Sequence, residues 1–198
     1  MNKTILLTGA TDGIGLETAK MLLAQGHTVL LHGRSQAKLN ALQVALTEQY
    51  PNASTHTYIA DLSDMSQVQP LAKNVLADLA ENNNQLDVLI NNAGVYQLVD
   101  ATTIDGLDAR FVVNTIAPYL LTKLLLPVLG HDSRVVNVSS AAQSSVNLNA
   151  LIGNTELPDS AAYAQSKLAI TMWSRHLGLE LKDTGPLVVS VNPKSLLG

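Results

Sequence analysis

Two tyrosine–lysine pairs in this sequence have a spacing that could support proton transfer: Tyr163 with Lys167, and Tyr119 with Lys123. A free tyrosine titrates near pH ~10 and is a poor base at neutral pH, but a lysine ammonium beside it stabilises the phenolate. Residues four apart on a helix lie on one face, so each pair brings its phenol and its ammonium together. Such a pair could exchange a proton with the oxygen of a carbonyl or an alcohol.

The position of each pair in the chain separates them. Tyr163 opens a predicted helix, after a loop that follows a strand ending in Ser139 and Ser140. Tyr119 lies inside a long apolar helix, where packing in the core is the simpler role. The sequence therefore favours Tyr163 and Lys167 as the reactive pair.

Short apolar strands alternate with helices along the whole chain. The predicted strands cover residues 3–7, 27–32, 55–60, 86–90, 134–138 and 187–191. The predicted helices cover residues 13–25, 36–49, a segment ending near 81, 104–128 and 160–182. Gly26 would end the helix over 13–25, Ser35 would cap the start of the helix over 36–49, and Thr103 would cap the start of the helix over 104–128. Residues 141–159 read as a loop. This alternation requires parallel strands, and therefore predicts an α/β fold: a doubly wound parallel sheet of the Rossmann type, with at least six strands and helices on both faces.

The first strand runs into a glycine-rich turn, residues 8–15, with the sequence TGATDGIG. Glycines allow a tight turn, the close approach of a pyrophosphate, and close packing of helix on strand. The free amides and the positive dipole end of the following helix attract phosphate. The spacing G-x-x-x-G-x-G differs from the commoner G-x-G-x-x-G, and a turn of this kind could also serve the fold without any ligand.

Composition narrows the class of protein. The 198 residues are 46% hydrophobic, carry a net charge of -4 and include no cysteine. The chain is long enough for one domain with a sizeable core, and its charge gives no argument for nucleic acid. Disulfides are excluded, and the five scattered histidines match no metal-ligand spacing. The richest apolar stretch, residues 119–129, falls short of the roughly 20 residues of a membrane span, so we expect a cytoplasmic protein without one.

The glycine spacing, the Asn-Asn-Ala-Gly sequence at residues 91–94 and the pair of Tyr163 with Lys167 resemble the short-chain dehydrogenase/reductase family. The resemblance covers nearly the whole chain. It implies an oxidoreductase that transfers a hydride between NADP(H) and a carbonyl or a primary or secondary alcohol, with Tyr163 as general acid and base. It also implies that Lys167 holds the nicotinamide ribose, that Ser140 holds the substrate oxygen, and that Asn114 links the proton relay to solvent. The cofactor-binding residues that it implies are Gly9, Thr11, Asp12, Gly13, Ile14, Gly15, Arg34, Asp61, Leu62, Asn92, Ala93, Gly94, Tyr163, Lys167 and Pro193.

The end of the second predicted strand bears on the choice of dinucleotide. A carboxylate there would bind the adenosine ribose of NAD, whereas an arginine would meet the 2′-phosphate of NADP. The chain has Arg34, with Lys38 one helical turn further on and no acid nearby. Because a guanidinium matches a phosphate well, we predict NADP(H) rather than NAD(H). The alternative is that Arg34 is a solvated surface charge.

Two features depart from the family pattern. Lys194 follows Pro193 where the family has a glycine, and the chain ends at Gly198, before the family's substrate-covering segment and seventh strand. We therefore expect a single dinucleotide-binding and catalytic domain over residues 1–198 without that lid.

The stretch near residues 147–158 lengthens the gap between Ser140 and Tyr163 and resembles the retinol-dehydrogenase-like branch, which implies a small, lipophilic substrate. In the family the helices around Asn114 and Lys167 pair between subunits, which implies a homodimer or homotetramer. Two other functions stay open: a non-enzymatic NADP(H)-binding regulatory or interaction protein on the same fold, and an epimerase or dehydratase that uses the same pair.

Overall fold

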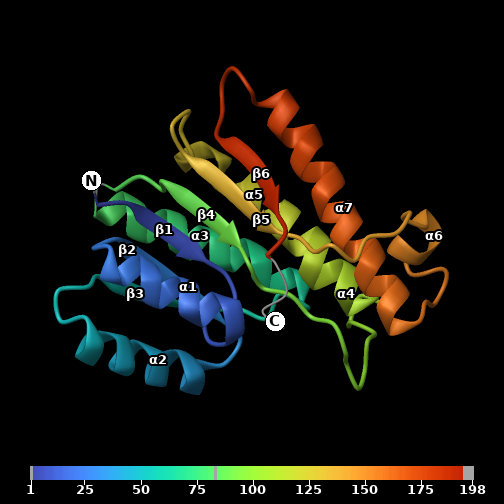
Figure 1. The fold of residues 1–198 in the computed structure, drawn as a ribbon, viewed down its shortest axis with the longest axis horizontal. Helices are drawn as coiled ribbons and strands as arrows, with labels where there is room; N and C mark the ends of the chain where they lie inside the picture. The colour runs from blue at the N-terminus through green and yellow to red at the C-terminus, as the bar shows by residue number, and fades with distance from the viewer. Residues whose placement is uncertain (1, 83, 194–198) are drawn as a thin grey trace.

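The computed structural model describes residues 2–82 and 84–193, in which six parallel strands form one sheet (Figure 1). The strands are β1 (Thr4–Leu7), β2 (Thr28–Gly33), β3 (Thr55–Ile59), β4 (Val88–Asn91), β5 (Arg134–Val138) and β6 (Leu187–Val191). Their order is β3-β2-β1-β4-β5-β6, so the direction of winding reverses between β1 and β4. This arrangement confirms the predicted doubly wound sheet, and the reversal is where such sheets bind ligands.

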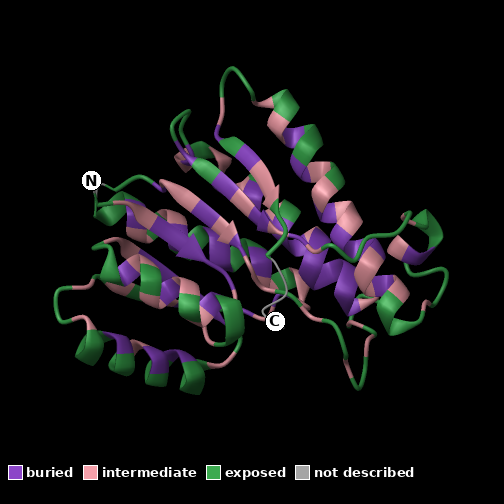
Figure 2. Cartoon of the chain, in the orientation of Figure 1, coloured by how far each residue is buried: buried purple, intermediate pink, exposed green. Residues whose placement is uncertain are grey.

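Helices cover both faces of the sheet. On one face, α1 (Gly13–Ala24) and α2 (Gln36–Gln49) pack against β1 and β2 through a cluster that includes Leu7 and Leu31. On the other face, α3 (Val68–Glu81), α5 (Ala117–Leu125) and α7 (Asp159–Glu180) contribute to a larger cluster that includes Leu6 and Leu89. The adjacent Leu6 and Leu7 point to opposite faces because side chains alternate along a strand. Buried residues accordingly mark the sheet and the inner sides of the helices (Figure 2).

The helix boundaries follow from local capping. The Asp12 carboxylate accepts a hydrogen bond from the Gly13 amide at the start of α1 (2.8 Å), and the Ser35 hydroxyl accepts one from the Lys38 amide at the start of α2 (3.4 Å). Gly26 has a φ of +80° just after α1, the conformation that glycine adopts most easily at a helix end. These caps confirm the predicted ends of both helices.

The prediction of one helix over residues 104–128 is wrong. Thr103 closes a turn instead, because its carbonyl accepts from the amide of Gly106, which has a φ of +74°. The helical run begins only after Asp108, whose carboxylate caps α4 (Ala109–Phe111). It then continues through the π-helical turn η2 (Val112–Ile116), α5 and the short 3₁₀ turn η3 (Leu126–Val128). Pro118 follows directly after the π-helical turn, as the second residue of α5.

Smaller differences concern two connections. The segment predicted as a loop over residues 141–159 contains the short helix α6 (Leu148–Leu151), capped by Asn147. The 3₁₀ turn η1 (Met65–Gln67) precedes α3. The departure predicted at Lys194 lies outside the described residues.

Within the part of the chain that the structure describes, one stretch is long and apolar enough to cross a membrane: Ala109–Val128, 20 residues with a mean hydropathy of 1.5. It is longer than the apolar stretch expected over residues 119–129. Just over half of its most apolar window, 56%, is buried inside the fold, with Phe111, Leu121 and Leu125 fully enclosed. A core helix passes the same test, and burial is what a core position requires.

Candidate active site

A cleft of about 760 Å³ lies along the carboxyl ends of the strands. The residues that the resemblance implied for cofactor binding all line it, from Gly9 in the glycine turn to Pro193 after β6. They come from segments spread over almost the whole chain, and the parallel sheet gathers them because each follows the end of a strand or opens the next helix.

The glycine turn has no room for side chains at two positions. A Cβ at residue 15 would collide with the carbonyl oxygen of Gly9 and lie 2.6 Å from Nδ2 of Asn92. A Cβ at residue 9 would lie 2.8 Å from Cα of Ala93, and Gly9 also has a φ of +65°. The turn therefore packs directly on the turn after β4, and the start of α1 lines the cleft.

The turn after β4 is tied to the end of β1 by side chains. The Thr8 hydroxyl accepts hydrogen bonds from the amides of Asn92 and Ala93 (3.0 and 3.1 Å), while Nδ2 of Asn92 donates to the carbonyls of Thr8 and Gly9 (2.9 and 3.0 Å). Thr8 is buried and Asn92 half-buried. The two turns therefore form one rigid floor under the middle of the cleft.

The far end of the cleft is lined by Tyr163 and Lys167. Nζ of Lys167 lies 5.7 Å from the ring centroid of Tyr163 and donates to the carbonyl of Val138 (2.8 Å). Burial lowers the pKa of Lys167 from 10.5 to about 8. This places a desolvated ammonium beside the phenol, as the spacing of the two residues predicted.

Asn114 lies fully buried behind Gly94, in η2. Its Oδ1 accepts from the Val95 amide (2.8 Å), and its Nδ2 donates to the Val95 carbonyl (2.9 Å) and to the hydroxyl of Ser166 (3.0 Å). A Cβ on Gly94 would lie 3.3 Å from Oδ1 of Asn114 and 3.5 Å from Nζ of Lys167. Asn114 thus adjoins the lysine from the side away from the cleft, and the π-helical turn that presents it is a geometry often found at functional sites.

The two serines after β5 take different positions. Ser139 lines the cleft wall, but its hydroxyl is engaged with the carbonyl of Lys167 and the hydroxyl of Thr171 (2.9 and 2.8 Å). Ser140 is half-buried, is not among the residues that line the cleft, and accepts a hydrogen bond from the Ala142 amide (3.1 Å). Of the four residues expected to take part in catalysis, Tyr163 and Lys167 therefore line the cleft, whereas Asn114, buried behind Gly94, and Ser140 do not.

The other predicted pair lies apart from this site. Tyr119 packs edge-on against Trp173, with ring centroids 5.4 Å apart, and neither Tyr119 nor Lys123 lines the cleft. The pair is therefore separate from the cleft as expected, but it does not lie in the core, because Tyr119 is 42% exposed and Lys123 is exposed.

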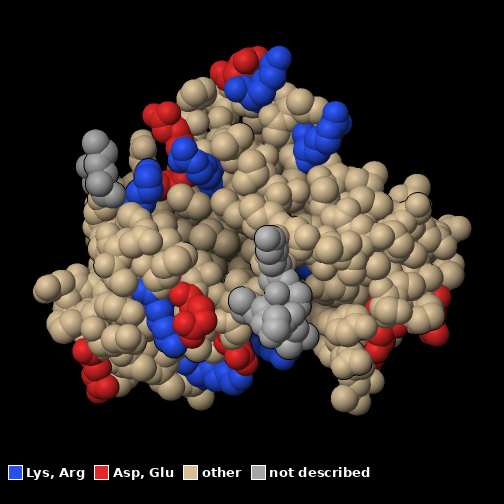
Figure 3. Space-filling view, viewed as in Figure 1, with Lys and Arg blue, Asp and Glu red and all other residues tan. Residues whose placement is uncertain are grey.

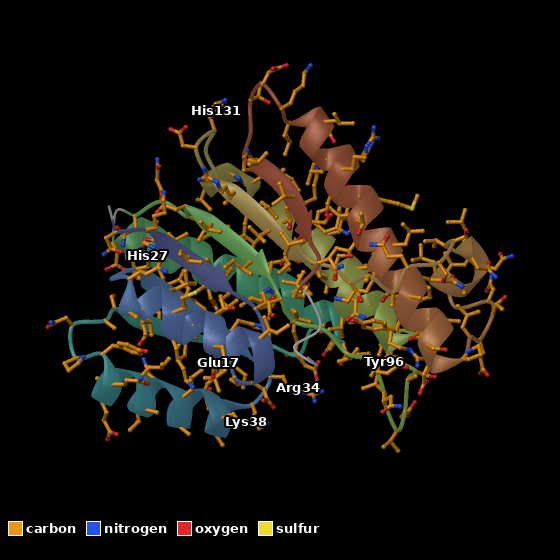
Figure 4. All side chains as sticks on the ribbon, in the orientation of Figure 1. Glu17, His27, Arg34, Lys38, Tyr96 and His131 are labelled. Atoms are coloured by element: carbon orange, nitrogen blue, oxygen red, sulfur yellow. The ribbon has the colours of Figure 1, made fainter. Side chains whose placement is uncertain are left out.

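The near end of the cleft carries charged side chains of both signs. Arg34 and Lys38 are exposed and line the cleft, and Nζ of Lys38 lies 4.0 Å from the carboxylate of Asp12. Asp61 also lines the cleft here and accepts hydrogen bonds from the amide and hydroxyl of Ser63. Figure 4 shows Arg34 and Lys38 near the starts of α1 and α2, with Tyr96 across the opening. Over the visible face as a whole, basic and acidic side chains stand in small interleaved groups (Figure 3).

Sequence reasoning missed two residues of the site. Tyr96 lines the cleft and stacks edge-on against Tyr163, with centroids 4.9 Å apart, but nothing in its sequence context signals this. His32 is buried at the end of β2 and also lines the cleft. A histidine that ends an otherwise apolar strand was the available signal.

Comparison with known proteins decides the family. A family model described as short chain dehydrogenase matches residues 3–196. The chain belongs to the short-chain dehydrogenase family. Among curated proteins of this kind, human retinol dehydrogenase 13 is 34% identical over 196 residues, which is 96% of this chain and 58% of that protein. The relatives place the chain in the retinol-dehydrogenase-like branch, and it spans less than two thirds of their length.

Solved structures with the same fold agree with this family assignment. A crystal structure of a protein from Mycobacterium Paratuberculosis superposes with a TM-score of 0.82 at 31% identity, covering 99% of this chain and 69% of that one. A metagenomic short-chain oxidoreductase in complex with NADP has a TM-score of 0.75 at 27% identity, covering 98% of this chain and 82% of that one. The short-chain dehydrogenase fold therefore extends over almost all of this chain.

Proposed function

We propose that this protein is an NADP(H)-dependent oxidoreductase that interconverts a carbonyl compound and an alcohol. The observation that carries the proposal is the shape of the cleft: one end holds Tyr163 and Lys167, and the other holds the glycine turn with Arg34. A dinucleotide is the ligand that needs both ends, because it joins a phosphate-bearing adenosine to a reactive nicotinamide through a pyrophosphate.

The cleft residues fit such a cofactor. The start of α1 lines the cleft, and a Cβ at Gly13 would meet nothing within 4 Å, which leaves room for a pyrophosphate at the helix N-terminus. Arg34 and Lys38 would hold a 2′-phosphate, and Asp61 with Leu62 would flank the adenine. Lys167 and Tyr163 would hold the nicotinamide ribose. When bound there, the cofactor supplies or accepts the hydride.

The chain's own residues would handle the proton. Tyr163 exchanges a proton with the substrate oxygen, and the ammonium of Lys167 stabilises negative charge that develops on the Tyr163 oxygen. The Ser140 hydroxyl accepts from the Ala142 amide, so its own proton can be donated to the substrate oxygen. Asn114 would connect the buried lysine to solvent through its contacts with Val95.

The substrate end of the cleft supports an apolar substrate. Val95, Leu98 and Val113 line it together with the exposed ring of Tyr96, which packs on Tyr163. Walls of this kind favour a small lipophilic molecule over a charged one, and retinol dehydrogenase 13 is named for such a substrate. We therefore propose an apolar aldehyde, ketone or alcohol as the substrate class.

Substitution of Tyr163 tests the catalytic assignment. Tyr163→Phe removes only the phenolic oxygen, so we expect at least a ~100-fold loss of NADPH-dependent carbonyl reduction. NADPH affinity should fall by only about threefold, because removing one hydrogen bond changes the binding constant by a few-fold. Tyr119→Phe is the matched control and should keep full turnover. Full turnover by Tyr163→Phe would overturn the assignment, and NADPH binding without turnover by the unchanged protein would favour a regulatory role.

Substitution of Arg34 tests the choice of cofactor. Arg34→Gln removes the guanidinium without changing much of the stem, so NADPH affinity should fall about tenfold while NADH affinity stays unchanged. Titration of both cofactors into both proteins measures this. Tighter binding of NADH than NADPH by the unchanged protein would contradict the preference.

A further inference from the structure

His32 connects the glycine turn to the third strand through both of its ring nitrogens. Its Nδ1 accepts a hydrogen bond from the Gly9 amide (3.3 Å), and its Nε2 lies 3.1 Å from the carbonyl oxygen of Ala60. Its backbone carbonyl accepts from the Ala10 amide (2.9 Å). The ring is only 2% exposed. One residue therefore holds two successive amides of the turn and reaches across to the segment that follows β3.

These contacts determine the state of the ring. A carbonyl oxygen can only accept, so Nε2 carries the proton and donates to Ala60, and Nδ1 is left as the acceptor for Gly9. An imidazolium would present an N–H to the Gly9 amide and lose that bond. Burial is the main reason that the pKa of His32 is lowered from 6.5 to about 4, so the ring is neutral at neutral pH.

The ring joins the two parts of the cleft that a dinucleotide would span. Gly9 belongs to the turn at the pyrophosphate position, and Ala60 precedes Asp61 and Leu62 at the adenine position. The Gly33 carbonyl also accepts from the Ala60 amide (3.2 Å), so the backbone next to His32 is fixed as well. The imidazole is the side-chain link between the two walls.

We propose that His32 is a positioning residue for cofactor binding: its neutral imidazole holds the glycine turn and the adenine wall at the separation that a bound dinucleotide requires. The inference rests on the proposed function for its ligand. It concerns affinity in the binary complex of protein and cofactor, so it can be tested without any turnover.

Three substitutions dissect the two hydrogen bonds. In His32→Asn, the amide oxygen can take the place of Nδ1 and keep the bond to Gly9. In His32→Gln, the amide nitrogen can take the place of Nε2 and keep the bond to Ala60. His32→Leu keeps neither. We expect His32→Leu to bind NADPH about tenfold more weakly, and the two amide variants about threefold more weakly, because each lost hydrogen bond changes the binding constant by a few-fold.

His27 supplies the matched control. It precedes β2 at the opposite end from His32, away from Arg34 and Lys38 (Figure 4). His27→Leu should bind NADPH as the unchanged protein does. Thermal melting without cofactor identifies any variant that fails to fold. If His32→Leu does not fold, the Asn and Gln variants carry the test, because each retains one of the two bonds.

The pH dependence of binding separates positioning from a merely structural role. As the pH falls from 6 towards 4, the ratio of NADPH affinity of the unchanged protein to that of His32→Asn should decrease, since only the former acquires an imidazolium. The other charged side chains at this end, Asp61, Asp12, Arg34 and Lys38, are the same in both proteins, so the comparison isolates the effect of His32. If all His32 variants bound NADPH as tightly as the unchanged protein, and the affinity ratio did not change with pH, the inference about His32 would be overturned. The proposed function would then still stand. Failure of the unchanged protein to bind NADPH would overturn the proposed function itself.

Discussion

Lys167 illustrates a conflict between stability and function at a single residue. Its side chain is 4% exposed and its pKa is lowered from 10.5 to about 8. Between those two values the unfolded chain binds a proton that the folded chain lacks, so stability should rise as the pH increases from 8 to 10.5. Below pH 8 the buried ammonium costs the fold on the order of 3 kcal/mol.

Replacement of Lys167 by methionine should therefore stabilise the cofactor-free protein. The gain at pH 7 should be about 1 kcal/mol, because the lost bond from the charged ammonium to the Val138 carbonyl offsets about 2 kcal/mol of the relief. Urea unfolding at pH 7 and at pH 10 measures it, and the gain should shrink at the higher pH. If Lys167→Met were less stable than the unchanged protein at pH 7, burial of the lysine ammonium would not cost the fold free energy.

At the scale of residues, the sequence predicted best those side chains whose arrangement follows from local spacing. The pair of Tyr163 with Lys167 follows from four-residue separation on a helix, and every residue expected to bind the cofactor lines the cleft. Ser140 was harder, because which of two adjacent serines faces the cleft depends on the path of the chain after β5. The histidine in an apolar strand was a signal for His32, but its contacts could not be predicted, since its partners come from two distant segments.

At the scale of elements, a buried arginine connects two helices. One is α4, which leads into the turn with Asn114, and the other is α7, which carries Tyr163. Arg110 is 2% exposed and makes bonds of 2.6 and 2.9 Å to Asp108 and a further ion pair with Asp159, the first residue of α7. The hydrogen bonds to Asp108 are the main reason that the pKa of Arg110 is raised. Its guanidinium is therefore fully committed to holding α4 against α7.

Removal of this link should destabilise the protein. Arg110→Met leaves a partly buried Asp108 without a counter-charge and should lower the free energy of unfolding by about 3 kcal/mol. Asp159→Asn should lower it by ~1 kcal/mol or less, because Asp159 is half-exposed. Urea unfolding measures both. Lys20→Met, which breaks an exposed pair with Glu17, is the control and should change it by roughly 0.3 kcal/mol. Equal stability of Arg110→Met and the unchanged protein would contradict this role.

The elements themselves were predictable where short-range signals were complete. The strands and the helices α1 and α2 follow from apolar runs with clear caps at Asp12 and Ser35. The helix expected over residues 104–128 failed because Thr103 offers a capping hydroxyl to a turn as readily as to a helix. Gly106 then decides for the turn through its positive φ. The π-helical turn at Asn114 depends on packing against α7, which no local pattern encodes.

At the scale of the whole molecule, we propose that α5 and α7 form the contact between subunits of a homodimer or homotetramer. Tyr119 on α5 is 42% exposed and packs on Trp173 of α7, so an aromatic pair lies at the surface where both helices meet. Exposed aromatic groups of this kind often mark an association surface. Tyr119→Glu should shift the protein towards the monomer in sedimentation analysis, with Tyr119→Phe as the control. A monomeric unchanged protein would contradict this proposal.

The whole fold places a phenol and an ammonium at one end of the cleft, and the proposed function requires hydride to pass between the nicotinamide and the carbonyl carbon of a substrate held there. The most direct measurement uses NADPH carrying deuterium at the transferable position of its nicotinamide, incubated with the full chain and a panel of apolar aldehydes and ketones. We predict that deuterium appears on the carbinol carbon of an alcohol product with the unchanged protein, and that Tyr163→Phe, saturated with the same cofactor, yields at least ~100-fold less. Bound NADPH with no deuterium in any alcohol across the panel would contradict it.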